Sequence, residues 1–398
     1  MRFTPLMPLA ALVLCSTAAA QTPVFTKIAD TATVAPGSSG TFSVFADARD
    51  ISAGKVAFMA YHSAGGSGIY SFANGVLKME ADNNTAVPGT TDTFQTFFGV
   101  SVDGGVVAFT GGWPGPGGGC AFNGSEGVFA KRLGAPMTPI MLQDSLTTVD
   151  HCFHGVELMG SVVLYAGGVN PVDSAHNHSE SIKATTISSP PIPLFDTATL
   201  KPSGAPFVGY DQDFFFRNNQ LLLAEILPNT FGAVAGLYLA TRNGPGPQVV
   251  ADSQTAVPSG SGNFSNFASA DFDGNEVAFV GRDSGNATAL YAGTNPSNLR
   301  LVAGRTTQVP GEVFNFSGLS NPCAFDSGVM LFSGYWGGGN GLFMVENGVI
   351  TELLRKGDVL DGRVVEQAFC RPGNKSGDFL IVDVRFAGFS PALYLVTL

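Results

Sequence analysis

The chain repeats itself, and this internal repeat limits the possible fold more than any other property of the sequence. One landmark is an apolar pair followed by Asp, then by Thr three positions later and often by Pro-Gly; clear copies begin at Ile28, Leu194 and Val250. The landmark returns about every 54 residues, and seven units can be recognised between residue 24 and the C-terminus. A period of this length is typical of architectures in which each repeat is one supersecondary unit.

Three other landmarks recur in step with the first. Each unit opens with aromatic residues, in most copies a pair, and continues with an apolar triplet and then a Gly-apolar-aromatic triplet. Clear aromatic pairs are Phe42/Phe45, Phe94/Phe97, Phe264/Phe267 and Phe314/Phe316. Clear triplets are Val56-Ala57-Phe58, Val107-Ala108-Phe109 and Val277-Ala278-Phe279, then Gly68-Ile69-Tyr70, Gly127-Val128-Phe129 and Gly236-Leu237-Tyr238.

Each unit therefore predicts four short strands. The aromatic pair marks the first strand, the two triplets mark the second and third, and the apolar run into Asp marks the fourth. Turns such as Asp103-Gly104-Gly105 and Asp273-Gly274-Asn275 separate the first two strands. Four strands in each unit without helical periodicity predict an all-β fold, a seven-bladed β-propeller of four-stranded blades. A β-solenoid is the structural alternative, although its repeats are usually shorter.

The order of strands at the two ends predicts how the ring closes. The repeat opens with a fourth strand at 24–29 and ends after a third strand at 393–396. The N-terminal strand can therefore complete the last blade and remove an exposed sheet edge. Residues 21–398 are expected to form a single domain.

Composition excludes two classes of protein. The 398 residues include 51 Gly and 24 Pro, and 44% are hydrophobic but only 13% charged. A chain with this much apolar content can bury a core and is not disordered. Acidic residues number 31 against 20 Lys and Arg, so the charge disfavours nucleic acid as a partner.

The N-terminus predicts export. One Arg, a short apolar stretch and small residues before Gln21 describe a signal peptide over residues 1–20. Lipid attachment at Cys15 is a less favoured alternative, because Leu14 stands where a small residue is expected. No further run of 18 apolar residues follows, so we expect a secreted or periplasmic monomer without a membrane span.

Four cysteines remain after the predicted signal peptide. An even number in an exported protein suggests disulfides, and three pairings are possible. We expect Cys120 to pair with Cys152 and Cys323 with Cys370, because each pair falls in neighbouring repeats.

Two segments carry a resemblance to a known repeat. Residues 101–109 and 271–279 resemble the S-x-D-G-x-x-I-A-F repeat of TolB-like propellers, which are WD40-like. The Ala-Asp-x-x-Thr-x-Val-Pro-Gly segment is similar to secreted tandem-repeat β-propeller proteins of bacteria whose function is uncharacterised. The resemblance implies an extracytoplasmic propeller that acts as a binding or interaction module, and it specifies no activity.

The repeated aspartates are the first candidates for a ligand site. They would stand at equivalent points around a ring, where carboxylates could bind a cation or a polyhydroxyl ligand. In the other interpretation, which we favour, each Asp accepts hydrogen bonds within its own turn. These residues are Asp30, Asp82, Asp144, Asp196 and Asp252.

Two further patterns suggest a metal, although no cofactor is required. Four histidines of the third unit, which could present imidazole to zinc, are His151, His154, His176 and His178. Asp271, Asp273 and Asn275 imitate the start of a calcium loop. The simpler interpretations are a polar loop for the histidines and a hairpin turn for the Asp-Gly-Asn sequence.

Complete enzyme motifs are missing from the sequence. It contains no H-E-x-x-H and no G-x-S-x-G. We therefore expect a non-catalytic module that binds a protein or a glycan. The alternative is an extracellular hydrolase or lyase with carboxylates at the channel mouth. Charged residues from several first strands, gathered around the channel, would favour the alternative.

Overall fold

The computed structural model of the protein describes most of the chain. The described residues are 22–115, 125–142, 152–168, 181–186, 189–196, 198–210, 214–226, 234–241, 244–388 and 390–398. Every regular element in them is a β-strand, and all strand pairs are antiparallel. The predicted all-β class is therefore confirmed. None of the described segments is a helix that could span a membrane.

Four of the sheets each contain four strands that follow one another in chain order. The first two contain β2 (Phe42–Ser52), β3 (Lys55–His62), β4 (Ser67–Ala73) and β5 (Val76–Asp82), then β6 (Thr96–Asp103), β7 (Val106–Trp113), β8 (Ser125–Arg132) and β9 (Thr138–Leu142). The other two contain β10 (Cys152–Met159), β11 (Val162–Gly168), β12 (Ser181–Thr186) and β13 (Ser189–Asp196), then β22 (Gly318–Asp326), β23 (Val329–Trp336), β24 (Gly339–Glu346) and β25 (Val349–Arg355).

Two sheets are larger. One contains β14 (Phe215–Arg217), β15 (Gln220–Ile226), β16 (Val234–Thr241), β17 (Gln248–Asp252), β18 (Phe264–Phe272), β19 (Val277–Asp283), β20 (Thr288–Gly293) and β21 (Arg300–Ala303). Its two halves are joined by a single pair between β16 and β18. The other contains β26 (Val359–Leu360), β27 (Arg363–Phe369), β28 (Lys375–Ser376), β29 (Phe379–Phe386), β30 (Pro391–Thr397) and β1 (Val24–Asp30). In this sheet β1 pairs with β30, so the two ends of the chain share one sheet.

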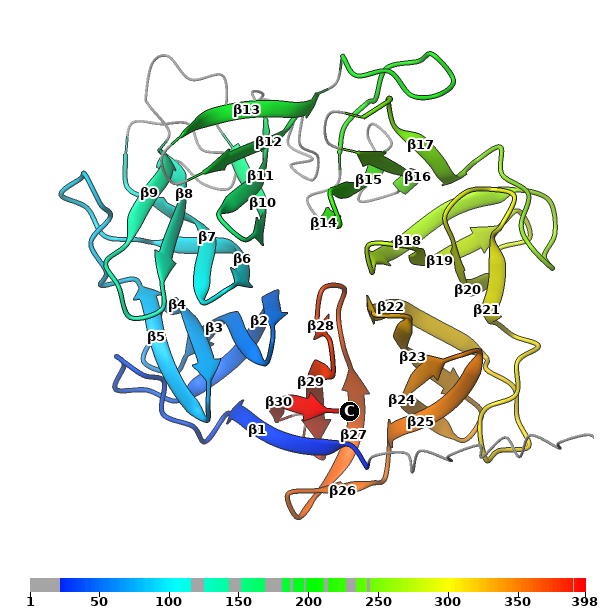
Figure 1. Cartoon of the computed structure of the whole chain (residues 1–398). Helices are drawn as coiled ribbons and strands as arrows, with labels where there is room; N and C mark the ends of the chain where they lie inside the picture. The colour runs from blue at the N-terminus through cyan, green and yellow to red at the C-terminus, as the bar shows by residue number, and fades with distance from the viewer. Residues whose placement is uncertain are drawn as a thin grey trace, which may run out of the picture.

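The sheets are arranged around a common centre (Figure 1). Strands β2, β6, β10, β14, β18, β22 and β28 lie nearest to this centre, and we call them the inner strands. Small antiparallel sheets placed radially around an axis are the architecture of a β-propeller, so the fold is that of a propeller.

The repeated aromatic residues form one cluster in each of several sheets. In the sheet that begins with β2, the ring centroids of Phe42 and Phe45 are 5.5 Å apart, and both rings lie 6.0 Å from that of Phe58. Tyr70 packs edge-on against Phe42 at 4.9 Å. The half of the eight-stranded sheet that begins with β18 has the same arrangement, formed by Phe264, Phe267, Phe279 and Tyr291. The sequence landmarks are therefore the parts of one packed core.

The position of the aromatic pair differs from the prediction in two units. Phe94 precedes β6 and packs with Phe97 from outside the strand. In the sixth unit Phe314 is 48% exposed, and Phe316 alone packs against Phe332 and Phe343. The pair therefore marks the entry into the inner strand rather than the strand itself.

A small residue on the second strand leaves room for the first aromatic ring. A Cβ atom added to Gly281 would lie 2.5 Å from the ring of Phe264, and one added to Gly334 would lie 2.4 Å from that of Phe316. In the first unit Ala60 holds this place, and there the rings of Phe42 and Phe58 are 6.0 Å apart, compared with 5.6 Å for Phe264 and Phe279. The glycine thus allows the closer packing.

We expect Gly281→Ala to lower the free energy of unfolding by about 1–3 kcal/mol, because overpacking of a filled core has a cost of this size. Gly318→Ala is the matched control, since no atom lies within 4 Å of its added Cβ. Chemical denaturation of the two variants measures the difference. Equal midpoints would contradict the role assigned to Gly281.

Candidate functional site

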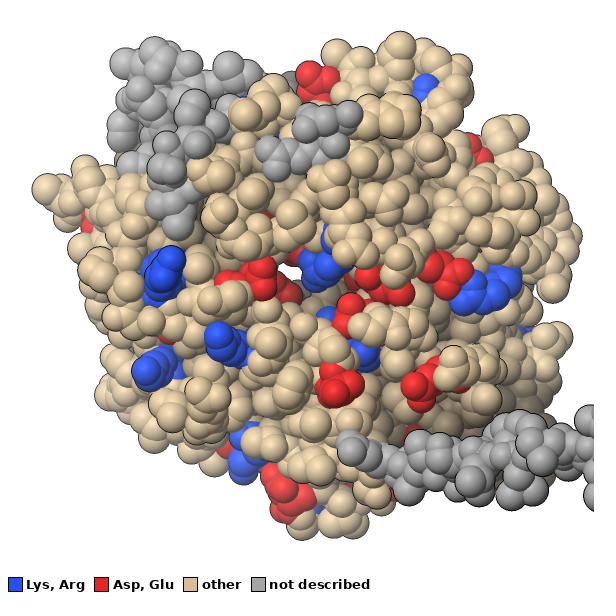
Figure 2. All heavy atoms as spheres, in the orientation of Figure 1, with Lys and Arg blue, Asp and Glu red and all other residues tan. Residues whose placement is uncertain are grey.

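Charged side chains gather around the central opening of the molecule (Figure 2). A cavity of about 300 Å³ lies there, lined by residues at the ends of inner strands. Its charged lining residues are Asp50, Asp103, Arg217, Asp326 and Lys375. These residues belong to five different inner strands, so the cavity exists only because the sheets meet at the centre.

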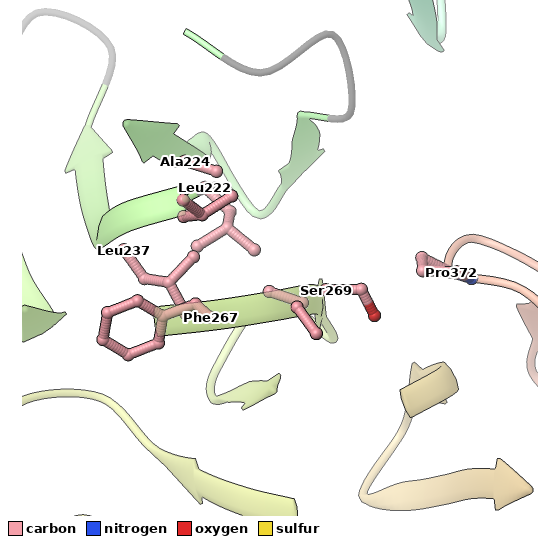
Figure 3. A pocket seen from close by; sticks show the side chains of 9 residues that line it. Leu222, Ala224, Leu237, Phe267, Ser269 and Pro372 are labelled. Atoms are coloured by element: carbon pink, nitrogen blue, oxygen red, sulfur yellow. The ribbon is translucent and has the colours of Figure 1, made fainter. Parts of the chain in front are cut away.

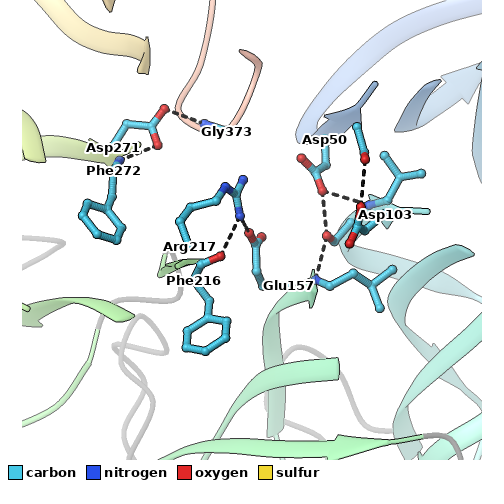
Figure 4. A network of polar contacts seen from close by, with 12 residues as sticks. Asp50, Asp103, Glu157, Phe216, Arg217, Asp271, Phe272 and Gly373 are labelled. Atoms are coloured by element: carbon cyan, nitrogen blue, oxygen red, sulfur yellow. Dashed lines mark hydrogen bonds and ion pairs between the residues drawn. The ribbon is translucent and has the colours of Figure 1, made fainter. Parts of the chain in front are cut away.

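An ion pair between two inner strands stands beside this cavity. Nη1 of Arg217 in β14 donates to Oε1 of Glu157 in β10 and, at 3.0 Å, to the carbonyl oxygen of Phe216 (Figure 4). The side chain of Arg217 is 29% exposed and that of Glu157 is 10% exposed. Within the described part of the chain, Nη2 and Nε of Arg217 and Oε2 of Glu157 have no protein hydrogen-bond partner. In the described structure the pair therefore keeps N–H donors on Arg217 and an acceptor oxygen on Glu157 that no protein group uses.

Two buried aspartates join neighbouring sheets. Asp50 in β2 accepts from Oγ of Ser101 at 2.6 Å and from the backbone N–H of Val102 at 2.8 Å, both in β6. Asp271 in β18 accepts from the N–H of Phe325 in β22 at 2.8 Å. Each carboxylate replaces backbone pairing that separate sheets cannot make with each other.

A second set of carboxylates also joins neighbouring sheets, two residues farther along the chain. The N–H of Gly160 donates to Asp103 at 2.6 Å, that of Gly328 to Asp273 at 3.2 Å and that of Gly377 to Asp326 at 2.6 Å. Ser52 also donates to Asp103, at 2.8 Å. We call the contacts of these two sets the inter-sheet clasps.

Burial changes the acidity of the carboxyl groups at the centre. Removal from water raises the pKa of Glu157 to about 8, although Arg217 opposes the change. Removal from water likewise raises the pKa of Asp271 to about 6, against the hydrogen bonds from backbone N–H groups. Burial also raises the pKa of Asp50, with Arg217 again opposing. The site therefore combines an arginine with carboxyl groups whose pKa values burial has raised.

The aspartates singled out from the sequence do not meet at the centre. Four of them lie on fourth strands of different sheets, and each Oδ1 accepts from the N–H two residues later and from the Thr hydroxyl three residues later, at 2.7–3.1 Å. These four are Asp30, Asp82, Asp196 and Asp252. They organise their own turns, as the favoured interpretation expected. Asp144 lies outside the described residues.

The predicted metal and disulfide sites are largely beyond the described part of the chain. His151, His176, His178 and Cys120 lie outside the described residues, as do the side chains of His154, Cys152 and Cys323. Cys370 is buried. Both disulfide pairings and the zinc site stay predictions. No set of three or more His, Cys, Asp or Glu side chains in the described segments is placed to hold a metal ion.

The calcium-like sequence forms a hairpin turn. Oδ1 of Asp273 accepts from the N–H groups of Asn275 and Glu276, at 2.7 and 2.8 Å. Asp271 is occupied by backbone N–H groups, including that of Phe272 at 2.7 Å. The simpler interpretation of this segment therefore accounts for its contacts.

Sequence reasoning missed Glu157 and Arg217. Glu157 occupies the same position in its inner strand as Asp50, Ser101 and Asp271 do in theirs. In all four cases the residue pairs with the residue seven positions later, on the next strand. Arg217 lies two residues after the corresponding position of β14, and Asp103 occupies the same place in β6. An alignment of the units on their hairpin turns would have shown both residues as departures from the Asp or Ser that β2, β6 and β18 lead to at these two positions.

No protein-family model and no curated protein sequence matches the chain. Among solved structures, the chain is similar to the β-propeller domain of the trilobed protease from Pyrococcus furiosus, with 11% identity and a TM-score of 0.48 over 89% of this chain and 95% of that chain. An acylaminoacyl peptidase from Pyrococcus horikoshii matches with 12% identity and a TM-score of 0.49 over 88% of this chain and 50% of that chain, so this chain spans half the length of the peptidase. A putative TolB from Agrobacterium tumefaciens matches with 11% identity and a TM-score of 0.38, over 81% and 94% of the two chains. We draw no functional argument from these similarities.

The raised pKa values predict that the protein becomes less stable as the pH rises. A carboxyl group with a higher pKa in the folded than in the unfolded chain stabilises the fold at low pH, and this contribution is lost as the pH rises through the folded pKa. For Glu157 the window runs from its ordinary value of 4.5 to about 8. We expect Glu157→Gln to flatten the fall in unfolding free energy across this window, by at most about 1.4 kcal/mol per pH unit.

Urea denaturation at several pH values measures this dependence. Glu276→Gln is the matched control, because it alters an ion pair whose Arg300 side chain is 54% exposed. If Glu157→Gln and the unmodified protein lose stability with the same slope, the assignment to Glu157 is wrong.

Proposed function

We propose that the protein is a closed seven-bladed propeller in which β14–β17 and β18–β21 are separate blades. The seven sequence repeats support this count, and so does the single pair that joins the two halves of the eight-stranded sheet. Closure is supported by the pairing of β1 with β30 and by the buried ion pair of Arg49 in β2 with Asp383 in β29, 2.5 Å apart.

We propose further that the central cavity binds a hydroxyl-rich ligand, a terminal sugar of a glycan, and that the protein acts as a secreted or periplasmic binding module. The observation that carries this proposal is the cavity of about 300 Å³ beside the Glu157–Arg217 pair. A water molecule occupies about 30 Å³ in the liquid, so the cavity has room for a small ligand such as one sugar ring. Export is supported by the signal-peptide pattern of residues 1–20.

The chemistry of the cavity favours hydroxyl groups. A guanidinium group only donates hydrogen bonds and an ionised carboxylate only accepts them, whereas a hydroxyl group does both. In the lining, Arg217 supplies donors, and the partly exposed carboxylates of Asp103 and Asp326 supply acceptors. A ligand with several hydroxyl groups satisfies both kinds, while a simple anion or cation would meet groups of its own charge.

We expect Arg217→Gln to weaken glycan binding by about 10- to 100-fold, because a hydrogen bond from a charged group contributes about 1.5–3 kcal/mol. An array of neutral and acidic oligosaccharides, followed by calorimetry with the strongest binder, provides the measurement. Arg300→Gln, on the exposed pair with Glu276, is expected to bind as the unmodified protein does. Absence of binding to every oligosaccharide, or equal affinity of the Arg217 variant, would overturn the proposal.

A carboxylate-dependent hydrolase is the second candidate, and one observation favours it. Glu157 has a pKa of about 8 and stands near the carboxyl groups of Asp50 and Asp271, both of which raise its pKa. A protonated carboxyl group beside carboxylates is the arrangement that glycoside hydrolysis requires. Side chains from several inner strands also meet here, as this alternative anticipated.

If Glu157 is a general acid, nitrophenyl glycosides should be hydrolysed at a rate that falls as the pH rises through about 8, since the acid must carry its proton. Glu157→Gln should abolish release of nitrophenol, whereas Glu276→Gln should not change it. Absence of hydrolysis with all the glycosides tested leaves the binding function alone.

A further inference from the structure

A loop from the last sheet extends into the centre of the ring. Residues 371–377, which include β28 and which we call the strap, run between β27 and β29 and reach the inner strands of other sheets (Figure 1). Oγ of Ser376 accepts from the N–H of Ala53 at 3.2 Å, and Nζ of Lys375 donates to the carbonyl oxygen of Asp326 at 3.0 Å. The strap therefore contacts sheets on either side of its own.

One contact of the strap crosses to a more distant sheet. The N–H of Gly373 donates to Oδ2 of Asp271 at 3.0 Å, and these two residues are 102 positions apart in sequence (Figure 4). Asp271 is 2% exposed and also accepts from Phe325, so its carboxylate holds the strap and an inner strand together. A hydrogen bond to an ionised acceptor is stronger than one between neutral groups.

The strap also contains a buried polar side chain that has no hydrogen-bond partner in the described structure. Asn374 is completely buried, and in the described structure neither Oδ1 nor Nδ2 of its side chain has a hydrogen-bond partner. Most buried polar side-chain atoms in proteins are paired, and leaving them unpaired is costly. The amide of Asn374 therefore opposes the contacts that hold the strap in place.

The strap lines two spaces of different character. On one side Lys375 and Ser376 line the polar cavity. On the other, Pro372 faces a pocket of about 40 Å³ formed by apolar side chains such as Leu222 and Phe267, together with Ser269 (Figure 3). Movement of the strap would change the lining of both spaces.

We propose that the strap is a movable gate of the central channel, with Asp271 as its latch and the buried amide of Asn374 as the group that favours opening. The hydrogen bonds of the strap with Ala53, Asp326 and Asp271 keep the gate closed, and the one with Asp271 is the contact to the most distant sheet. The unpaired amide of Asn374 opposes them, because it gains hydrogen bonds when the gate opens. Opening enlarges the space available to a ligand beside Arg217.

Hydrogen–deuterium exchange of the full chain without ligand tests the gate, with peptides that cover the strap read by mass spectrometry. Asp271→Asn removes the charged acceptor, so we expect exchange in the strap to become about tenfold faster. Asn374→Leu removes the unpaired amide and keeps the size of the side chain, so we expect exchange to become about tenfold slower. Two substitutions with opposite effects distinguish a gate from general loosening of the fold.

Asp273→Asn is the matched control, because Asp273 lies two residues from Asp271 and accepts from Gly328 but does not contact the strap. It should leave exchange in the strap unchanged. Exchange in peptides from β22 shows whether Asp271→Asn has loosened that strand as a whole. The proposal is overturned if the strap exchanges as slowly as β27 and β29 in every variant, or if both substitutions change its exchange in the same direction. Since no ligand is present, failure of glycan binding would leave this result unaffected.

Discussion

Aromatic packing within each sheet is the interaction on which the rest of the structure depends. The first aromatic residue of a unit lies against rings from the second and third strands, as Phe264 does against Phe279 and Tyr291 at 5.6 and 5.0 Å. This packing fixes the direction in which the chain enters the inner strand. The last residues of that strand then reach the centre of the ring. The polar chemistry at the opening thus depends on an apolar cluster far from it.

This dependence explains how much of the fold the sequence could predict. The aromatic pair, the two triplets and the Gly-containing turns are local features, and each determines contacts within its own unit. The order of strands in a sheet follows from short hairpins, so the architecture could be predicted without knowing how the sheets meet. The contacts of the aspartates on the fourth strands are also local. Their hydrogen bonds with the Thr three residues later explain why they recur; these residues are Thr33, Thr85, Thr199 and Thr255.

The candidate site could not be predicted in the same way, because its members are not local. Glu157 and Arg217 are 60 positions apart, and only the arrangement of neighbouring sheets brings them together. Neither residue belongs to a motif of enzyme chemistry. Each stands where other sheets carry a residue of the inter-sheet clasps, so repetition identifies the structural positions, and departure from the repetition identifies the unusual ones.

The ion pair of Arg217 with Glu157 is a poor means of joining two sheets. Removing two charges from water costs free energy that their attraction often only balances, so a buried pair contributes little to stability. The aspartate clasps achieve the same connection by accepting backbone N–H groups, as Asp271 does from Phe325. Arg49 and Asp383 form another buried pair, but the Arg49 side chain is only 1% exposed and presents nothing to the cavity. Arg217 keeps 29% of its side chain exposed and two nitrogen atoms without a protein partner in the described structure. A stabilising contact would not need this exposure, whereas recognition of a ligand requires it.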